Sequence, residues 1–197
     1  MLTHLTLFYT HRLHGNLAYL PRLHTYLEQA RMRQQGASLL LDLGEACHPD
    51  VAHCVATGGR SALVVLDGMG YHALNVADAL TAENRHKLEG ITTAGLIDLA
   101  HVWRYHVPPV RDEGIVVALH PSPALRLCIV LTPAERTHLT GGCLYLAGID
   151  GHQVGMVRVN VEEARLEEAR IDDVPPDIPP NVSIAAVVEF VEAEARL

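Results

Sequence analysis

The first half of the chain alternates between short apolar segments and amphipathic segments. Four apolar, strand-length runs occur at residues 5–10, 38–43, 73–76 and 91–97. Between them, apolar residues recur at helical spacing, which predicts one helix starting near Pro21 and ending before Gly36, and two more at about 60–69 and 79–88. This β-α-β-α-β-α-β order predicts a mainly parallel sheet covered by helices.

The second half is richer in strands. Pro, Gly and polar turns separate four further predicted strands, at Val116–His120, Leu125–Leu131, Cys143–Ala147 and Val154–Val161. Four prolines and three aspartates within residues 172–180 predict an extended loop. Ser183 is expected to cap a last helix, Ile184–Ala195. A chain of 197 residues fits one domain, so we expect residues 1–197 to form a single α/β domain.

Composition excludes several classes of protein. Hydrophobic residues make up 49% of the chain and aromatic residues 5%, so a packed aliphatic core is expected. The net charge of −8 argues against nucleic acid as a partner. No apolar run reaches the roughly 18 residues that a membrane span needs, and the first ten residues look like a strand and not a signal peptide. A soluble, cytoplasmic protein without membrane or nucleic-acid partners is therefore expected.

The cysteines and several histidines suggest packing roles. No two of the four cysteines form a Cys-x-x-Cys pair, so we expect buried free thiols in a reducing compartment at Cys47, Cys54, Cys128 and Cys143. His53 next to Cys54 lacks the i, i+4 spacing of helical metal ligands and is assigned to packing or the surface.

Polar residues gather where predicted strands end, which is where open α/β sheets carry their sites. The first strand is followed by His11, Arg12 and His14. The second ends at Asp42, with Gly44, Glu45 and His48 after it, and the end of the third carries Asn75 and Asp78.

These segments resemble the 5′-nucleotidase branch of the calcineurin-like metallophosphoesterases. Residues 10–15 (Thr-His-Arg-Leu-His-Gly) stand where the family has Thr-Asn-Asp-x-His-Gly, and residues 42–45 (Asp-Leu-Gly-Glu) where it has Asp-x-Gly-Asp. Residues 70–73 (Gly-Tyr-His-Ala) match its Gly-Tyr-Asp-Ala, so the first match spans roughly residues 5–81. Residues 144–157 are similar to the closing strands, where Gly-Lys-x-Val-Gly is usual.

The resemblance implies a metallophosphoesterase-like layered sandwich of the αββα type with mixed sheets. Because the chain is short for this family, one helical layer is expected to be reduced. Members of the family clamp a phosphate between two metal ions, using carboxylates, His and Asn at adjacent strand ends.

The motifs also depart from the family pattern. Arg12 replaces an aspartate and cannot ligate a metal, while His14 is kept. Glu45 stands at the bridging Asp, and Asp78 and Ala79 stand at the Asn and His of Gly-Asn-His-Glu. No Gly-His-x-His context surrounds the later histidines, His101, His106, His120 and His138.

Two uses of the site stay open. Arg12 could replace the lost ion by pairing with Asp42 and Glu45, or it could bind a phosphate-bearing ligand. Alternatively, one divalent ion (Mn, Zn or Mg) could be held by His14, Asp42, Glu45 and Asp78, with His11 or His48 completing the set and Asn75 nearby.

The leading hypothesis is a non-catalytic or weakly active protein of this fold with a binding or scaffolding role. The alternatives are a metal-dependent phosphatase or phosphodiesterase with a reduced metal site, and an anion- or nucleotide-binding module. A homodimer is also expected, because a reduced helical layer would leave apolar sheet surface to cover.

Overall fold

The first of two β-sheets is built around the predicted parallel strands. The computed structural model describes residues 3–34, 36–77, 79–105, 114–122 and 126–196. In this sheet the strand order is β11-β10-β1-β2-β3-β4. Strands β1 to β4 are parallel neighbours, and β10 runs antiparallel between β1 and β11. The six strands are β1 (His4–Thr10), β2 (Ala37–Asp42), β3 (Ala73–Asn75), β4 (Gly95–Ile97), β10 (Gln153–Asn160) and β11 (Arg165–Asp173).

The second sheet is formed by the middle of the chain, in the order β5-β6-β7-β9-β8. Its three central strands are parallel, and each edge strand is antiparallel to its neighbour. The strands are β5 (Trp103–Tyr105), β6 (Ile115–Ala118), β7 (Leu127–Ala134), β8 (His138–Thr140) and β9 (Cys143–Ala147).

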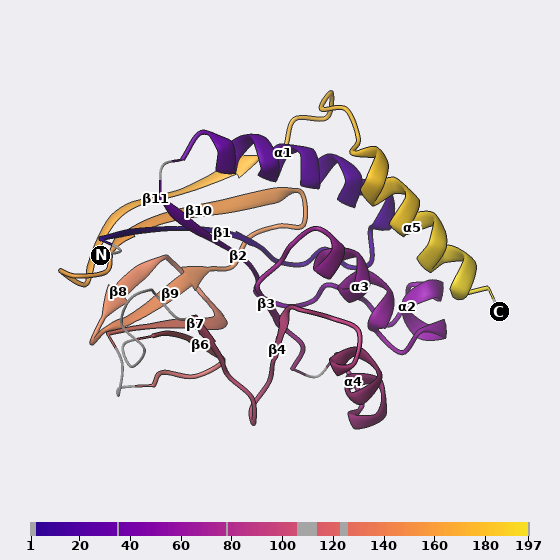
Figure 1. Cartoon of the computed structure of the whole chain (residues 1–197), viewed down its shortest axis with the longest axis horizontal. Helices are drawn as coiled ribbons and strands as arrows, with labels where there is room; N and C mark the ends of the chain where they lie inside the picture. Colours follow the sequence, from indigo (N-terminus) through magenta and orange to yellow (C-terminus); the bar gives the residue numbers. More distant parts are fainter. Residues whose placement is uncertain (1–2, 35, 78, 106–113, 123–125, 197) are drawn as a thin grey trace.

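Among the described residues, helices pack on the face of the first sheet that points away from the second sheet (Figure 1). Several buried side chains pack against the first sheet from each of the helices α1 (Leu20–Met32), which follows a short 3-10 turn (Leu17–Tyr19), α3 (Arg60–Gly68) and α5 (Val182–Glu194). Two shorter helices are α2 (Ala52–Ala56) and α4 (Ala82–Glu89). In the part of 90–181 that the structure describes, no helix occurs. None of the described helices has the length and apolar character needed to cross a membrane.

Strand alternation explains why the first sheet is buried on both faces. In β1, Phe8 points into the cluster under the helices, whereas Leu7 and Tyr9 point into the cluster shared with the second sheet. The second sheet contributes residues such as Ile129 and Leu144 to that shared cluster. The predicted fold class, a layered α/β sandwich with mixed sheets, is confirmed.

The differences from the predicted elements concern short or exposed segments. The sequence pattern did not indicate β5, β8, α2 or β11; the last is an edge strand whose side chains are mostly exposed and charged. The predicted helix at 79–88 begins instead at Ala82, because Thr81 accepts a hydrogen bond from the Asn84 amide. The last helix is capped by Asn181 and not by Ser183.

Gly155→Ala is expected to destabilise the fold by roughly 1–3 kcal/mol, because overpacking a core forces side chains off their rotamers. Gly155 pairs with Tyr9 across β10 and β1, and a Cβ at this glycine would overlap the buried Tyr9 ring. Urea unfolding measures the change. Gly90→Ala is the control, since a Cβ at that glycine would meet open space; equal midpoints for the two variants would contradict the prediction.

Candidate functional site

Backbone hydrogen bonds connect the loop that follows β1 with the loop that follows β2. The Leu43 amide donates to the Thr10 carbonyl at 2.8 Å, and the Arg12 amide to the Gly44 carbonyl at 3.1 Å. Further along, the His14 amide donates to the Glu45 carbonyl at 2.9 Å. This backbone ladder extends the parallel pairing of the two strands beyond the sheet and brings the predicted polar residues together.

The same loops hold three non-glycine residues in the left-handed region. The φ angles are 57° at Arg12, 50° at His14 and 57° at Glu45. Such conformations cost free energy for residues with a Cβ and tend to persist at functional sites. Their location in one small region makes these loops the candidate site of the molecule.

Glu45 is the centre of the cluster. Its Oε2 lies 2.9 Å from Nε2 of His14, and its Oε1 lies 3.4 Å from Nε2 of His11 and 3.6 Å from Nε of Arg12. The hydrogen bond with His14, followed by the nearby charges of His11 and Arg12, lowers the pKa of Glu45 despite partial burial. The carboxylate is therefore held ionised among basic side chains. We name Glu45, His11, Arg12 and His14 the Glu45 cluster.

The members of the Glu45 cluster differ in exposure. The side chains of Arg12, His14 and Glu45 are 49%, 45% and 52% exposed, so they face solvent. His11 is 2% exposed, and its Nδ1 makes no hydrogen bond within the described residues. Burial lowers the pKa of His11, which favours the neutral ring. His48 lies beside the cluster, with its ring centroid 5.1 Å from that of His14.

Asp42 is separated from the Glu45 cluster by its burial. It is 0% exposed; its Oδ2 accepts from the Thr10 hydroxyl at 2.8 Å and its Oδ1 from the Gly44 amide at 2.9 Å. Burial raises the pKa of Asp42 to about 7, because a charged carboxylate loses its hydration there. The expected pairing of Arg12 with both acids therefore holds only for Glu45, and Asp42 is served by neutral donors.

The side chain of Asn75 also forms hydrogen bonds with backbone groups. Its amide nitrogen donates to the Leu43 carbonyl at 2.8 Å, and its oxygen accepts from the Ala77 amide at 3.0 Å. It ties the end of β3 to the loop after β2 and lies outside the Glu45 cluster. Asp78, the remaining predicted ligand, lies outside the described residues.

The donor set does not fit a pair of metal ions. Arg12 brings a fixed positive charge to the Glu45 carboxylate, and Asp42 uses both oxygens inside the protein. Within the described residues, the His and carboxylate atoms of the Glu45 cluster do not form a group close enough to share one ion, whereas Cys47, His53 and Cys54 do.

The cysteine prediction is wrong for one pair. Cys47 and Cys54 form a disulfide, with their Cα atoms 5.6 Å apart, while Cys128 and Cys143 are buried free thiols as expected. The turn before α2 brings the two cysteines together over seven residues, a proximity that no Cys-x-x-Cys pattern announces. His53, predicted to be a packing or surface residue, has hydrogen bonds to Ser61 and Gly15, and one of its ring nitrogens lies close to the two sulfur atoms.

The fold is that of the metallophosphoesterase-like layered sandwiches. No family model matches the sequence, and no curated protein matches it. Among solved structures, the chain is similar to NAD nucleotidase (NadN) of Haemophilus influenzae, with a TM-score of 0.64 and 9% identity over 98% of this chain and 60% of that chain.

Two further solved structures agree. Sulfate thiohydrolase SoxB of Thermus thermophilus has a TM-score of 0.68 and 12% identity over 96% of this chain and 60% of that chain. A 5′-nucleotidase precursor, also of Thermus thermophilus, has a TM-score of 0.65 and 12% identity over 98% of this chain and 58% of that chain. At these identities the likeness shows the fold, and the chain spans about three fifths of these proteins' length.

Proposed function

We propose that this protein is a non-catalytic binding protein of the metallophosphoesterase-like fold, whose ligand is a phosphate-bearing small molecule. The observation that carries the proposal is the Glu45 carboxylate held by Arg12, His11 and His14 at the strand ends. In the 5′-nucleotidase motif that this segment resembles, an aspartate stands at the position of Arg12 and helps to bind the metal ions. Arg12 supplies a permanent positive charge in their place.

The Glu45 cluster offers an anion the exposed, permanent positive charge of Arg12, because burial favours the neutral form of the His11 ring. One carboxylate faces an arginine and two histidines, with a third, His48, beside them. The Arg12 guanidinium is half-exposed and contacts Glu45 through Nε at 3.6 Å, a longer distance than a charge-assisted hydrogen bond prefers. A phosphate could therefore take the remaining donors of Arg12 without burying an unpaired charge.

A thermal-shift titration with inorganic phosphate and adenosine monophosphate tests the proposal. A ligand that binds only the folded state must raise the melting temperature with its concentration. We expect the rise in the wild-type protein and its loss in Arg12→Ala. Arg33→Ala, which removes an exposed arginine at the end of α1, is expected to keep it. No rise in the wild type, or an equal rise in Arg12→Ala, would overturn the proposal.

A metal-dependent phosphatase with a reduced, one-ion site is the second candidate. His11 and His14 both approach the Glu45 carboxylate, and two histidines and a carboxylate are a known donor set, but their donor atoms would have to move closer together to share one ion. This candidate requires manganese-dependent hydrolysis of a phosphate ester that Glu45→Gln abolishes.

The expected homodimer also stays a prediction, which sedimentation can test.

A further inference from the structure

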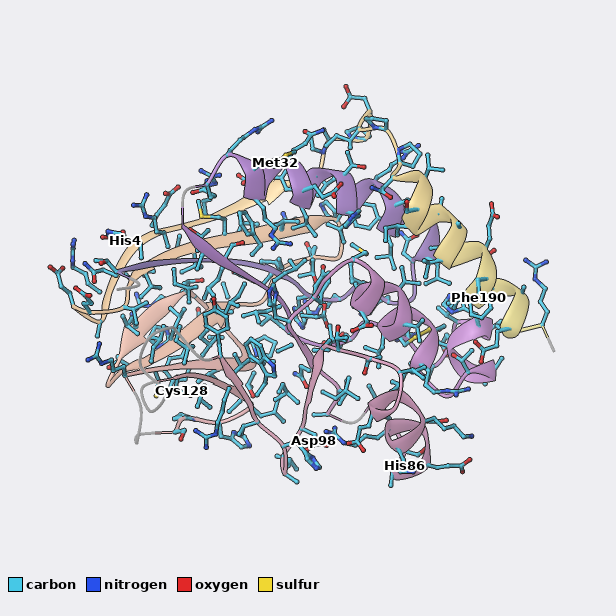
Figure 2. All side chains as sticks on the ribbon, viewed as in Figure 1. His4, Met32, His86, Asp98, Cys128 and Phe190 are labelled. Atoms are coloured by element: carbon cyan, nitrogen blue, oxygen red, sulfur yellow. A yellow bond between two sulfur atoms is a disulfide. The ribbon has the colours of Figure 1, made fainter. Side chains whose placement is uncertain are left out.

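Three side chains with metal-binding atoms meet next to the Glu45 cluster but outside it. One donor atom from each of Cys47, His53 and Cys54 lies within 4.8 Å of the others. Cys47 comes two residues after Glu45, and the other two lie on α2. In Figure 2 the yellow sulfur–sulfur bond is beside α2, whereas the labelled Cys128 belongs to the second sheet.

The ring of His53 is oriented as metal-binding histidines usually are. Its Nε2 lies 2.9 Å from the Gly15 carbonyl oxygen. Because a carbonyl oxygen can only accept, Nε2 carries a proton, which leaves Nδ1 unprotonated in the neutral ring, where its lone pair can accept a hydrogen bond or bind a metal. A hydrogen bond from the other nitrogen to a backbone carbonyl is the common support of a metal-bound histidine.

A buried hydroxyl lies among the three donors. Oγ of Ser61, a residue that is 2% exposed, is 2.8 Å from Nδ1 of His53, 3.4 Å from Sγ of Cys47 and 3.9 Å from Sγ of Cys54. Nδ1 of His53 therefore faces a buried hydroxyl that also lies near both sulfur atoms, and this hydroxyl must turn away for Nδ1 to bind an ion. An oxygen at this place can support the site by a hydrogen bond or complete a fourth position.

A hollow open to solvent borders the two cysteines. It has a volume of about 290 Å³ and is lined by Cys47, Cys54, His48, Val55 and Ala79, among others. An ion has a path to the cysteines through this hollow, and His48 stands at its edge as a further nitrogen donor.

We propose that Cys47, His53 and Cys54 form a zinc site that exists only while the Cys47–Cys54 disulfide is reduced. Thiolate and imidazole ligands select Zn²⁺ over Mg²⁺ or Mn²⁺. A dithiol reductant donates two electrons and two protons to the disulfide and itself becomes a disulfide. Zn²⁺ then displaces the two thiol protons, and two Zn–S bonds form where the S–S bond was broken. The oxidised protein has no thiolate here and does not bind the ion.

Titration of the oxidised and the reduced protein with Co²⁺, followed by competition with Zn²⁺, tests the proposal. A phosphine reductant prepares the reduced form, because it adds no competing thiol. We expect thiolate-to-Co²⁺ absorption and one bound ion per chain in the reduced protein, displaced by Zn²⁺, and neither signal in the oxidised protein. This comparison needs no substitution and is therefore independent of any effect on folding.

Variants assign the ligands. In the reduced state, Cys54→Ser is expected to weaken zinc binding at least about tenfold, as loss of a ligand or its support typically does. Cys128→Ser, a control at a buried thiol of the second sheet, is expected to bind zinc like the wild type. Equal binding by the oxidised and reduced forms, no binding by the reduced form, or unchanged binding by Cys54→Ser would overturn the proposal. None of these outcomes depends on the phosphate titration.

Discussion

Arg12→Asp is expected to raise the affinity of the oxidised protein for Mn²⁺ at least about tenfold, which corresponds to ~1.4 kcal/mol. The substitution removes the positive charge that lies 3.6 Å from Glu45 and adds a carboxylate beside His14. Carboxylate oxygens and imidazole suit Mn²⁺. The backbone is also prepared, because residue 12 has a φ of 57°, a conformation in which aspartate is more common than arginine.

Isothermal titration of Arg12→Asp, Arg12→Ala and the wild type with Mn²⁺ measures this gain. Arg12→Ala removes the charge without adding a ligand, so its affinity should fall between the other two. Using the oxidised protein keeps the thiols of Cys47 and Cys54 out of the measurement. Equal affinities in all three proteins would show that Arg12 does not keep a cation from the Glu45 cluster.

Asp42→Asn is expected to stabilise the protein above pH 7. Burial raises the pKa of Asp42 in the folded state from 3.8 to about 7, which corresponds to on the order of 4 kcal/mol at most. Between these pH values the folded state keeps a proton that the unfolded state loses. The contribution of Asp42 to the free energy of unfolding therefore falls as pH rises from about 4 to about 7.

The asparagine amide avoids this cost and keeps the local hydrogen bonds. Its oxygen can accept from the Gly44 amide, and its nitrogen can donate to the Thr10 hydroxyl, which then donates to Tyr71. Urea unfolding at several pH values should show a stability difference, Asp42→Asn minus wild type, that grows from pH 4 to pH 7 and then levels off. Asp50→Asn, an exposed change in the following loop, should stay within about 0.5 kcal/mol of the wild type. A difference for Asp42→Asn that does not change with pH would contradict the buried-acid interpretation.

The sequence predicted the parts of the fold that depend on local pattern. Apolar runs such as residues 5–10 and 38–43 became the central strands, because a buried strand needs apolar residues on both faces. The edge strand β11 was missed because its side chains are mostly charged and exposed, and its pairing with β10 is what makes it a strand.

The candidate site was predicted only in part, for a similar reason. The positions of Arg12, His14 and Glu45 after two predicted parallel strands were enough to predict that they lie close together, because parallel strands end at the same edge of a sheet. The sequence motif around Asp42 does not show whether an aspartate binds a metal or stabilises a turn. Asp42 does the latter: its carboxylate accepts a hydrogen bond from the amide two residues later, which is typical of aspartate turns. The disulfide and the orientation of His53 depend on the distance between loops, which sequence spacing does not give.

The most direct test of the central claim is the metal content of oxidised wild-type protein. The protein is washed free of chelator, soaked with Mn²⁺ or Zn²⁺, desalted and analysed by elemental mass spectrometry, with Glu45→Gln alongside. We expect no retained ion in either protein, because Arg12 is the cation of the Glu45 cluster. About one or two ions per chain in the wild type, absent from Glu45→Gln, would contradict this and favour the metal-dependent phosphatase instead.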